Sequence, residues 1–266
     1  MAGARRSARE PGKSDPIAAL SVARAALREP DLPTARLDSI DREVRLLVDY
    51  RDVLISDRTG HQSRLRWFLV QLGIPEPPLR KLSMLSVLGG VDRLLVGRAE
   101  PCVRIARDLV ARISELTVAI DDLARQIGAL AKILAPALLG LHGCGPLSAA
   151  KLFAETAGIG RFRSRAAFAA HTGTAPMPVW AGNLVRHRLS RGGNRQLNAA
   201  LHRIAITQLR GPSLGQAYVA KRIAAGDTKT EAIRALRRRL SDEVFRRLQT
   251  DEASRAGIDD VSRAAA

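Results

Sequence analysis

The sequence is poor in aromatic residues, because Phe, Trp and Tyr together make up 3% of its 266 positions. Stacking of bases on aromatic side chains is therefore excluded as the main way of binding a nucleic acid. Cysteine is also scarce: Cys102 and Cys144 stand alone and form no CxxC motif or Cys/His cluster. Their spacing argues against a zinc site or a disulfide framework and indicates two inert thiols in a reducing cytoplasm.

Long apolar segments are missing as well. The most apolar run, residues 127–141, is too short to cross a bilayer and contains Lys132 and Pro136. The first eleven residues include arginines but no apolar segment follows them, as it would in a secretory signal. We therefore expect a soluble, cytoplasmic protein that does not associate with a membrane.

Acidic residues are in the minority. The chain has 43 Lys+Arg against 26 Asp+Glu, a formal net charge of +17, and a sequence pI near 11.3. Such a balance is typical of proteins that bind polyanions, nucleic acid above all. The alternative is a ribosome-associated protein or a charge that serves solubility alone. With so few aromatic residues, phosphate contacts should dominate the binding of nucleic acid.

Helical periodicity runs through the first half of the chain. We expect a short helix over residues 16–27, capped by Ser14 or Asp15, and a long amphipathic helix over residues 37–72 that ends at Gly73. Between 109 and 134, isoleucine and leucine alternate at four-three spacing. This heptad favours a two-stranded parallel coiled coil between chains. An antiparallel hairpin with residues 37–72 inside one chain remains the alternative.

After Pro136 the pattern changes to short helices separated by glycine. Residues 138–153 are typical of a helix-hairpin-helix, in which Gly143 and Gly145 let backbone N–H groups approach a phosphate. A plain turn between helices is the alternative. Further helices are predicted over 161–176, 194–210 and 218–248, with a tail after Asp251. We find no alternating strand pattern, so the predicted fold is all-α.

Four motifs in the second half occur in a fixed order. They are residues 141–146 (LHGCGP), 168–176 (FAAHTGTAP), 186–198 (RHRLSRGGNRQLN) and 200–208 (ALHRIAITQ). The stretch 138–210 that contains them resembles the C-terminal transposase domain of the insertion-sequence 110 family. Lys13-Ser-Asp-Pro-Ile and the long charged helices also look like the middle region of that family.

This resemblance implies a DNA recombinase with two half-sites. Members open with a RuvC-like α/β domain whose four acidic residues bind Mg²⁺, continue through a coiled coil, and end in a domain that supplies a serine nucleophile. The family also implies a structured guide RNA, and assembly of a dimer or tetramer through the coiled coil. The corresponding segments here would be a RuvC-like remnant (1–32), a coiled-coil helical hairpin (33–135), the transposase domain (136–225) and a basic helix with a tail (226–266).

The sequence departs from the family pattern at its predicted catalytic positions. Most of the strand-rich N-terminal domain has no counterpart in these residues. In the last acidic motif Asp15 fits, but Ala18 replaces the second aspartate, and one carboxylate does not hold two magnesium ions. Ala181 aligns with the nucleophilic serine and has no oxygen that can attack DNA. Ser190 is the nearest serine, and either it acts in place of the missing nucleophile or it caps the following helix.

The basic residues of the signature remain. Arginine side chains here can clamp phosphates. His187 either orients a phosphate or is a polar surface residue. Asn194 either caps a helix or contacts the DNA backbone. The predicted DNA-binding residues are Gly143, Gly145, Arg186, His187, Arg188, Arg191, Asn194 and Arg195. We therefore expect a transposase fragment that binds DNA without cleaving it. The alternative is a DNA-binding partner or competitor that dimerises with an intact transposase.

Overall fold

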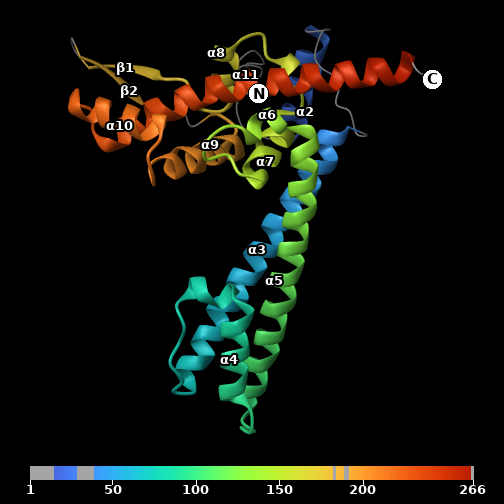
Figure 1. Cartoon of the computed structure of the whole chain (residues 1–266), viewed down its shortest axis with the longest axis vertical. Coiled ribbons are helices and arrows are strands. Elements are labelled where there is room, and N and C mark those ends of the chain that lie inside the picture. Colours follow the sequence, from blue (N-terminus) through green and yellow to red (C-terminus); the bar gives the residue numbers. More distant parts are fainter. Residues whose placement is uncertain (1–14, 29–38, 182–183, 189–191, 265–266) are drawn as a thin grey trace. The chain divides into compact units, whose positions relative to one another are not determined.

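The computed structural model is shown in Figure 1. It describes residues 15–28, 39–181, 184–188 and 192–264; for 178–181, 184–188 and 257–264 it describes the backbone alone. The chain divides into two compact units, residues 1–37 and 38–266, which are treated separately below. The expected all-α class is confirmed, because helices dominate the residues that the structure describes.

The first unit contains one described helix, α2 (Asp15–Arg28). It begins at Asp15 itself, so Asp15 is a helical residue rather than the residue before the helix; Ser14 lies outside the described residues. Pro16 suits the first turn, where its missing N–H has no helical partner. The short helix expected over 16–27 is thus confirmed.

The second unit begins with two long helices, α3 (Ile40–Gln71) and α5 (Pro101–Leu134). Between them lie the 3₁₀ helix η1 (Leu79–Ser83) and α4 (Leu85–Leu95). One buried cluster joins Val44 and Val48 to Ile127, and another joins Leu65 and Leu69 to Val103 through Ile113. The start of α3 therefore packs on the end of α5, and the end of α3 packs on the start of α5. The two helices form an antiparallel hairpin within the chain (Figure 1).

Between the two clusters, the hairpin has a polar middle. The Arg58 guanidinium donates to the Thr117 hydroxyl at 3.3 Å, across the two helices. Burial lowers the pKa of Arg58, and the nearby Asp121 acts against that shift. Arg58 therefore lies between helices of one chain, where a polar contact can fix their register.

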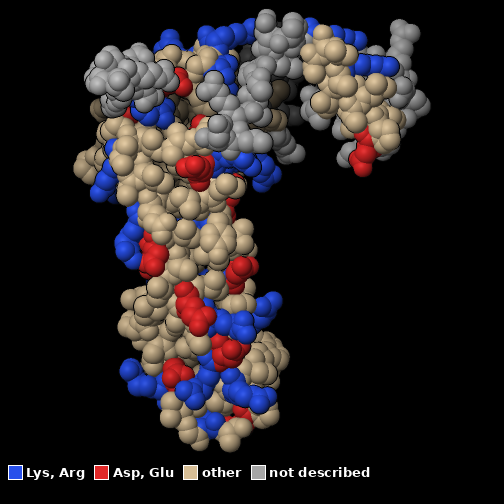
Figure 2. All heavy atoms as spheres, turned by 90° about the vertical axis from the view of Figure 1, so that its right-hand side faces the viewer, with Lys and Arg blue, Asp and Glu red and all other residues tan. Residues whose placement is uncertain are grey.

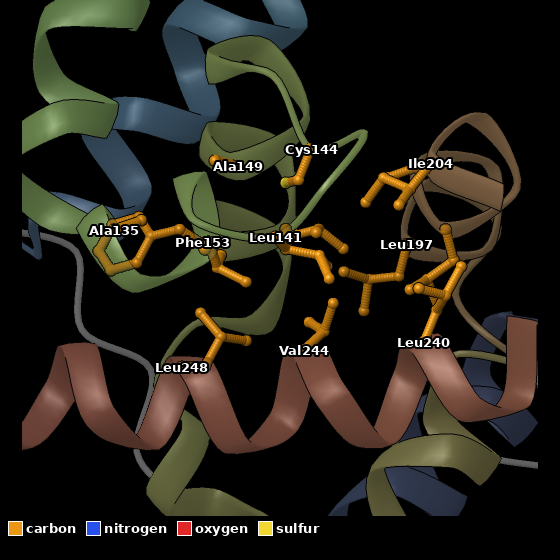
Figure 3. Packing of buried hydrophobic residues seen from close by; sticks show 14 of the residues in the cluster. Ala135, Leu141, Cys144, Ala149, Phe153, Leu197, Ile204, Leu240, Val244 and Leu248 are labelled. Carbon is orange, nitrogen blue, oxygen red and sulfur yellow. The ribbon is translucent and has the colours of Figure 1, made fainter. Parts of the chain in front are cut away.

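The remaining helices enclose a single core. They are α6 (Pro136–Leu139), α7 (Pro146–Thr156), η2 (Ile159–Arg161), α8 (Arg165–His171), α9 (Arg195–Gln208), α10 (Leu214–Ala224) and α11 (Lys229–Ala264). Every residue of α7 from Ala149 to Thr156 is buried. Figure 3 shows side chains of α7, α9 and α11 turned toward one another, among them Phe153, Leu197 and Val244.

Three predictions about this region need correction. The single helix expected over 218–248 is wrong: α10 ends at Ala224, Gly226 adopts φ +100°, and α11 starts at Lys229. The tail expected after Asp251 is helical as far as Ala264. Strands were not expected, yet β1 (Met177–Ala181) and β2 (Leu184–Arg188) form an antiparallel pair.

None of the helices in the described residues has the length and apolarity that a membrane span needs.

Candidate nucleic-acid interface

The predicted nucleophile position lies in the β-hairpin. Its register pairs Ala181 with Leu184, so Ala181 is in the last pair before Gly182 and Asn183, which lie outside the described residues. Two residues that include glycine are a common connection in tight hairpins. The hairpin thus presents Ala181 at its tip.

The predicted phosphate-binding residues of the signature lie on the second strand. Arg186 pairs with Val179, His187 with Pro178 and Arg188 with Met177. Arg191, like Ser190, lies outside the described residues. The structure therefore brings Arg186, His187 and Arg188 onto the same hairpin as Ala181, and their contact with DNA remains a prediction.

The base of the hairpin is closed by hydrogen bonds and one close backbone contact between the segments that precede and follow it. The Asn194 amide donates to the His171 carbonyl at 2.6 Å, and the Asn198 Nδ2 donates to the Thr172 carbonyl at 2.9 Å. A Cβ atom on Gly193 would lie 2.3 Å from the amide nitrogen of Gly173. Only glycine fits at position 193, because the opposing atoms are backbone.

Asn194 is the residue before α9 and caps it. Its Oδ1 accepts from the amides of Gln196 and Leu197 at 2.9 and 3.1 Å, as an N-cap residue does. Its Nδ2 donates to Glu155 Oε2 at 2.7 Å. Of the two roles considered for Asn194, the structure shows the helix cap. The next residue, Arg195, is exposed.

Two buried charged residues of α7 hold this end of α9. Glu155, with 3% of its side chain exposed, accepts the hydrogen bond from Asn194 Nδ2. Its other carboxylate oxygen, Oε1, lies 3.7 Å from Arg45 Nε. Lys151, equally buried, donates to Gln196 Oε1 at 2.9 Å and pairs with Asp52. Each charge has a partner, as buried charges require. Neither residue was expected from the sequence, since both sit in an otherwise apolar helical run.

The glycine turn between α6 and α7 has two different glycines. Gly143 adopts φ +83°, and a Cβ there would lie 3.1 Å from the Ile204 carbonyl oxygen of α9. Gln208 Nε2 donates to the neighbouring His142 carbonyl at 2.7 Å. Gly145, by contrast, precedes α7 and has open space around it. Gly143 therefore packs the turn onto α9, and Gly145 is the one that leaves the backbone approachable.

The helix before this turn, α6, is fastened to α11 by two side chains that the sequence did not single out. The Asp251 carboxylate accepts from the amides of Ala137 and Leu138 at 2.7 and 3.3 Å, and so caps α6 from across the fold. Burial raises the pKa of Asp251, although these hydrogen bonds act against the shift. Arg247 Nη1 donates to the Ala137 carbonyl at 2.5 Å. These contacts therefore fix α6, from which the turn starts, to α11.

Cys144 lies inside this turn and is buried. Burial raises the pKa of its thiol to about 12, with Arg247 acting in the opposite direction. The thiol is therefore protonated at neutral pH, which makes it a poor nucleophile.

The region from α6 into α10 matches a known protein family. The family model described as Transposase IS116/IS110/IS902 family matches residues 135–220. This segment is therefore similar to the IS116/IS110/IS902 transposase family. The match covers α6 through most of α10, and so includes the glycine turn, the β-hairpin and α9. No curated protein matches the chain.

The resemblance that the four motifs indicate is thus confirmed over the transposase domain. The match does not include Asp15 or the long helices α3 and α5, where the likeness to the family stays a prediction.

The donors near Asp15 do not fit the magnesium ion that the family implies. Asp15 is exposed at the start of α2, and Ala18 one turn later offers no oxygen. Within the described ranges, three or more His, Cys, Asp or Glu residues nowhere gather into a metal-binding group. The two magnesium ions of such a site need several converging carboxylates, and the described residues near Asp15 do not supply them.

Positive charge is concentrated around the transposase domain. Residues 135–266 contain 21 Lys+Arg and 9 Asp+Glu, whereas residues 40–134 contain 15 and 12. On the face drawn in Figure 2, basic side chains alternate with acidic ones along α3 and α5. Pairs such as Arg107–Asp92 at 2.9 Å and Arg112–Asp108 at 2.8 Å neutralise that surface. The electrostatic attraction for a polyanion therefore comes mainly from the C-terminal half.

Proposed function

We propose that this chain binds DNA through its transposase domain and does not cleave it. The observation that carries the proposal is the position of Ala181 at the tip of a hairpin whose second strand holds Arg186 and Arg188. An alanine there offers no nucleophile, while the arginines keep the chemistry for phosphate contacts. The proposal of inactivity rests on Ala181, not on the length of the chain.

Three features support DNA binding. The C-terminal half carries most of the net charge, Gly145 leaves the start of α7 open, and the family of the domain is one of transposases. The N-terminal end of a helix carries a partial positive charge that favours an anion such as a phosphate. The family resemblance adds a structured guide RNA as an expected second nucleic-acid partner.

Binding to duplex DNA at increasing salt tests the first half of the proposal. We expect the logarithm of the association constant to fall linearly with the logarithm of salt concentration, with a slope of about −0.9 for each phosphate contacted. A slope near zero, or no binding at 50 mM salt, would contradict DNA binding and favour a protein whose charge serves only solubility.

A covalent-adduct assay tests the second half. Purified chain is incubated with labelled DNA carrying element ends, with guide RNA and Mg²⁺, and adducts are separated under denaturing conditions. We expect no adduct from the unchanged chain. An adduct that persists would refute the proposal, and its loss in Ser190→Ala would identify Ser190 as the nucleophile.

A second candidate function, partner or competitor of an intact transposase, is favoured by one feature of α5. Ile113, Ile120 and Ile127 are buried within the chain, whereas Leu116 and Leu123, spaced seven residues apart, are only half-buried. A leucine row at this spacing can form the seam of a further helix pairing.

The competitor function makes a separate prediction about association. Sedimentation of the chain with and without an intact transposase should show a mixed oligomer that Leu116→Glu with Leu123→Glu abolishes. Val118→Glu, on an exposed side chain of the same helix, is the control. Equal sedimentation of both variants would exclude this function.

A further inference from the structure

A cleft of about 640 Å³ opens between the glycine turn, the start of α10 and one face of α11. Its lining includes His142 from the turn, Ser213 just before α10, Tyr218 of α10, and Arg239, Arg246 and Arg247 from α11. A shallower hollow beside Gly143 and Gly145 shares Gly140, Leu141 and His142 with the cleft. The cleft therefore adjoins the open end of α7.

The walls of the cleft are fixed by hydrogen bonds between its elements. Ser213 Oγ accepts from the Gln216 amide at 3.0 Å and so caps α10, and it donates to the Gln208 carbonyl at 2.7 Å. The Gln208 side chain lies close to Gly215, where a Cβ would meet its Oε1 at 2.1 Å. The same side chain binds the His142 carbonyl. One residue of α9 thus joins α10 to the glycine turn.

The cleft carries more positive than negative charge. Its three arginines face a single carboxylate, Glu243, which pairs with both Arg246 and Arg247. Arg247 is further committed to the Ala137 carbonyl. The Arg239 guanidinium lies 4.2 Å from the centre of the Tyr218 ring, and within the described residues it forms no ion pair. Arg239 and the exposed Arg246 are therefore available to a second anion.

The start of α10 adds to this attraction. Ser213, Leu214 and Gly215 line the cleft, so the N-terminal end of an eleven-residue helix opens on it. The partial positive charge of a helix N-terminus favours an anion. Together with two arginines of α11, it makes a cleft suited to phosphate.

We infer that this cleft binds backbone phosphates of DNA through Arg239 and Arg246. The inference rests on the proposed DNA binding and deepens it, because it assigns a phosphate contact to α11, outside the segment 135–220 matched by the family. Arginine suits the role, since its planar guanidinium can hold two phosphate oxygens at once. The DNA would then lie along both the start of α7 and the face of α11.

The test compares two double variants with matched geometry. Arg239→Gln with Arg246→Gln removes the proposed contacts. Arg104→Gln with Arg125→Gln removes two exposed arginines of α5; Arg125 pairs with Asp122 three residues away, as Arg246 pairs with Glu243. Both doubles lose the same charge, and thermal unfolding of each checks that it folds as the unchanged chain does.

Duplex DNA binding is measured for all proteins between 50 and 300 mM salt. The cleft double should reduce the salt slope by about 1 to 2 and weaken binding at 0.1 M salt by about tenfold per contact. The α5 double should leave the slope unchanged, and Arg239→Lys with Arg246→Lys should restore most of it. Equal slopes for the two glutamine doubles would overturn the inference while leaving the proposed function intact.

Further results distinguish DNA phosphate from free phosphate as the ligand of the cleft. They also distinguish failure of the inference from failure of the proposed function. If inorganic phosphate displaces DNA from the unchanged chain no better than chloride of the same ionic strength, and does not bind through Arg239 and Arg246, the cleft takes backbone phosphates. If phosphate displaces DNA more effectively than chloride, and only when Arg239 and Arg246 are present, the two ligands compete for these arginines and the inference stands. If phosphate binds the unchanged chain through Arg239 and Arg246 without displacing DNA, the cleft takes free phosphate and the inference is wrong. No DNA binding by the unchanged chain overturns both the inference and the proposed function.

Discussion

Adding one methyl group at Gly193 should weaken the fold far more than adding it at Gly192. A Cβ on Gly193 would lie 2.3 and 2.5 Å from the amide nitrogen and Cα of Gly173, and 2.9 Å from the His171 carbonyl oxygen. These are backbone atoms, so the segments on either side of the hairpin must separate. A Cβ on Gly192 meets nothing within 4 Å.

The cost at Gly193 can be worked from two contributions. Overpacking of a close backbone contact costs about 1–3 kcal/mol. Lengthening the 2.6 Å hydrogen bond from the Asn194 amide to the His171 carbonyl removes about 1 kcal/mol more. The free energy of unfolding should thus fall by about 2–4 kcal/mol, which lowers the melting temperature of a domain of this size by roughly 5–15 °C.

The measurement is thermal and urea unfolding of the unchanged chain, Gly193→Ala and Gly192→Ala under one buffer. Gly192→Ala should stay within about 1 kcal/mol of the unchanged chain, because it alters mainly the freedom of the unfolded chain. Unfolding midpoints of the two variants that agree within about 2 °C would show that the hairpin base is not closed at Gly193.

Three other substitutions test neighbouring contacts. Asn194→Ala removes the cap of α9 and the amide partner of buried Glu155, so it should lower the free energy of unfolding by about 2–4 kcal/mol in urea titration; an unchanged midpoint would contradict the cap. Asp251→Ala should be destabilising by about 1–3 kcal/mol because two amides of α6 lose their acceptor, and Asp251→Asn, which keeps one acceptor oxygen, should cost less. Burial and the nearby Arg161 lower the pKa of His171 below 6.5, with Glu155 acting in the opposite direction. The stability that depends on neutral His171 is therefore complete above pH 6.5 and is lost as the pH falls through its lowered pKa, and His171→Gln should flatten that part of the stability profile between pH 7.5 and 5.

Much of the helical architecture follows from the sequence, because its apolar spacing is long and regular. The spacing over 37–72 predicts α3, and Gly73 ends it with φ +67°. The heptad over 109–134 predicts most of α5, but it does not say which helix covers the isoleucines. That choice depends on the connection through α4, which lets α3 fold back within the same chain.

A capping motif marks the start of α11, but the apolar periodicity of residues 218–248 hides it. Thr228 and Glu231 form a reciprocal cap, in which the Thr228 amide donates to Glu231 Oε2 at 3.0 Å and the Glu231 amide to Thr228 Oγ1 at 3.3 Å. A Thr-x-x-Glu motif after Gly226 marks a helix start. The run of basic and apolar residues across 218–248 concealed it, because charged and apolar positions continue on both sides of the break.

The β-hairpin could have been found from its connection. Five residues rich in apolar side chains, then Gly182 and Asn183, then Leu184 and Val185 are typical of a short hairpin. Pro178 in the first strand and the arginines in the second obscure the alternation. By contrast, no local pattern reveals Glu155 and Lys151, since their partners come from α3 and α9, far away in the sequence.

The contacts that hold the hairpin and the position that would carry chemistry are separate. Gly193, Asn194 and Glu155 close the base of the hairpin through backbone and buried contacts, whereas Ala181 lies in the last pair before its turn. A change between alanine and serine at position 181 adds or removes a hydroxyl without altering any of the contacts at the base. The surface proposed to bind DNA therefore does not depend on which of the two residues stands there. For this reason Ala181→Ser should leave stability and DNA affinity unchanged, and a variant of the base should reduce both.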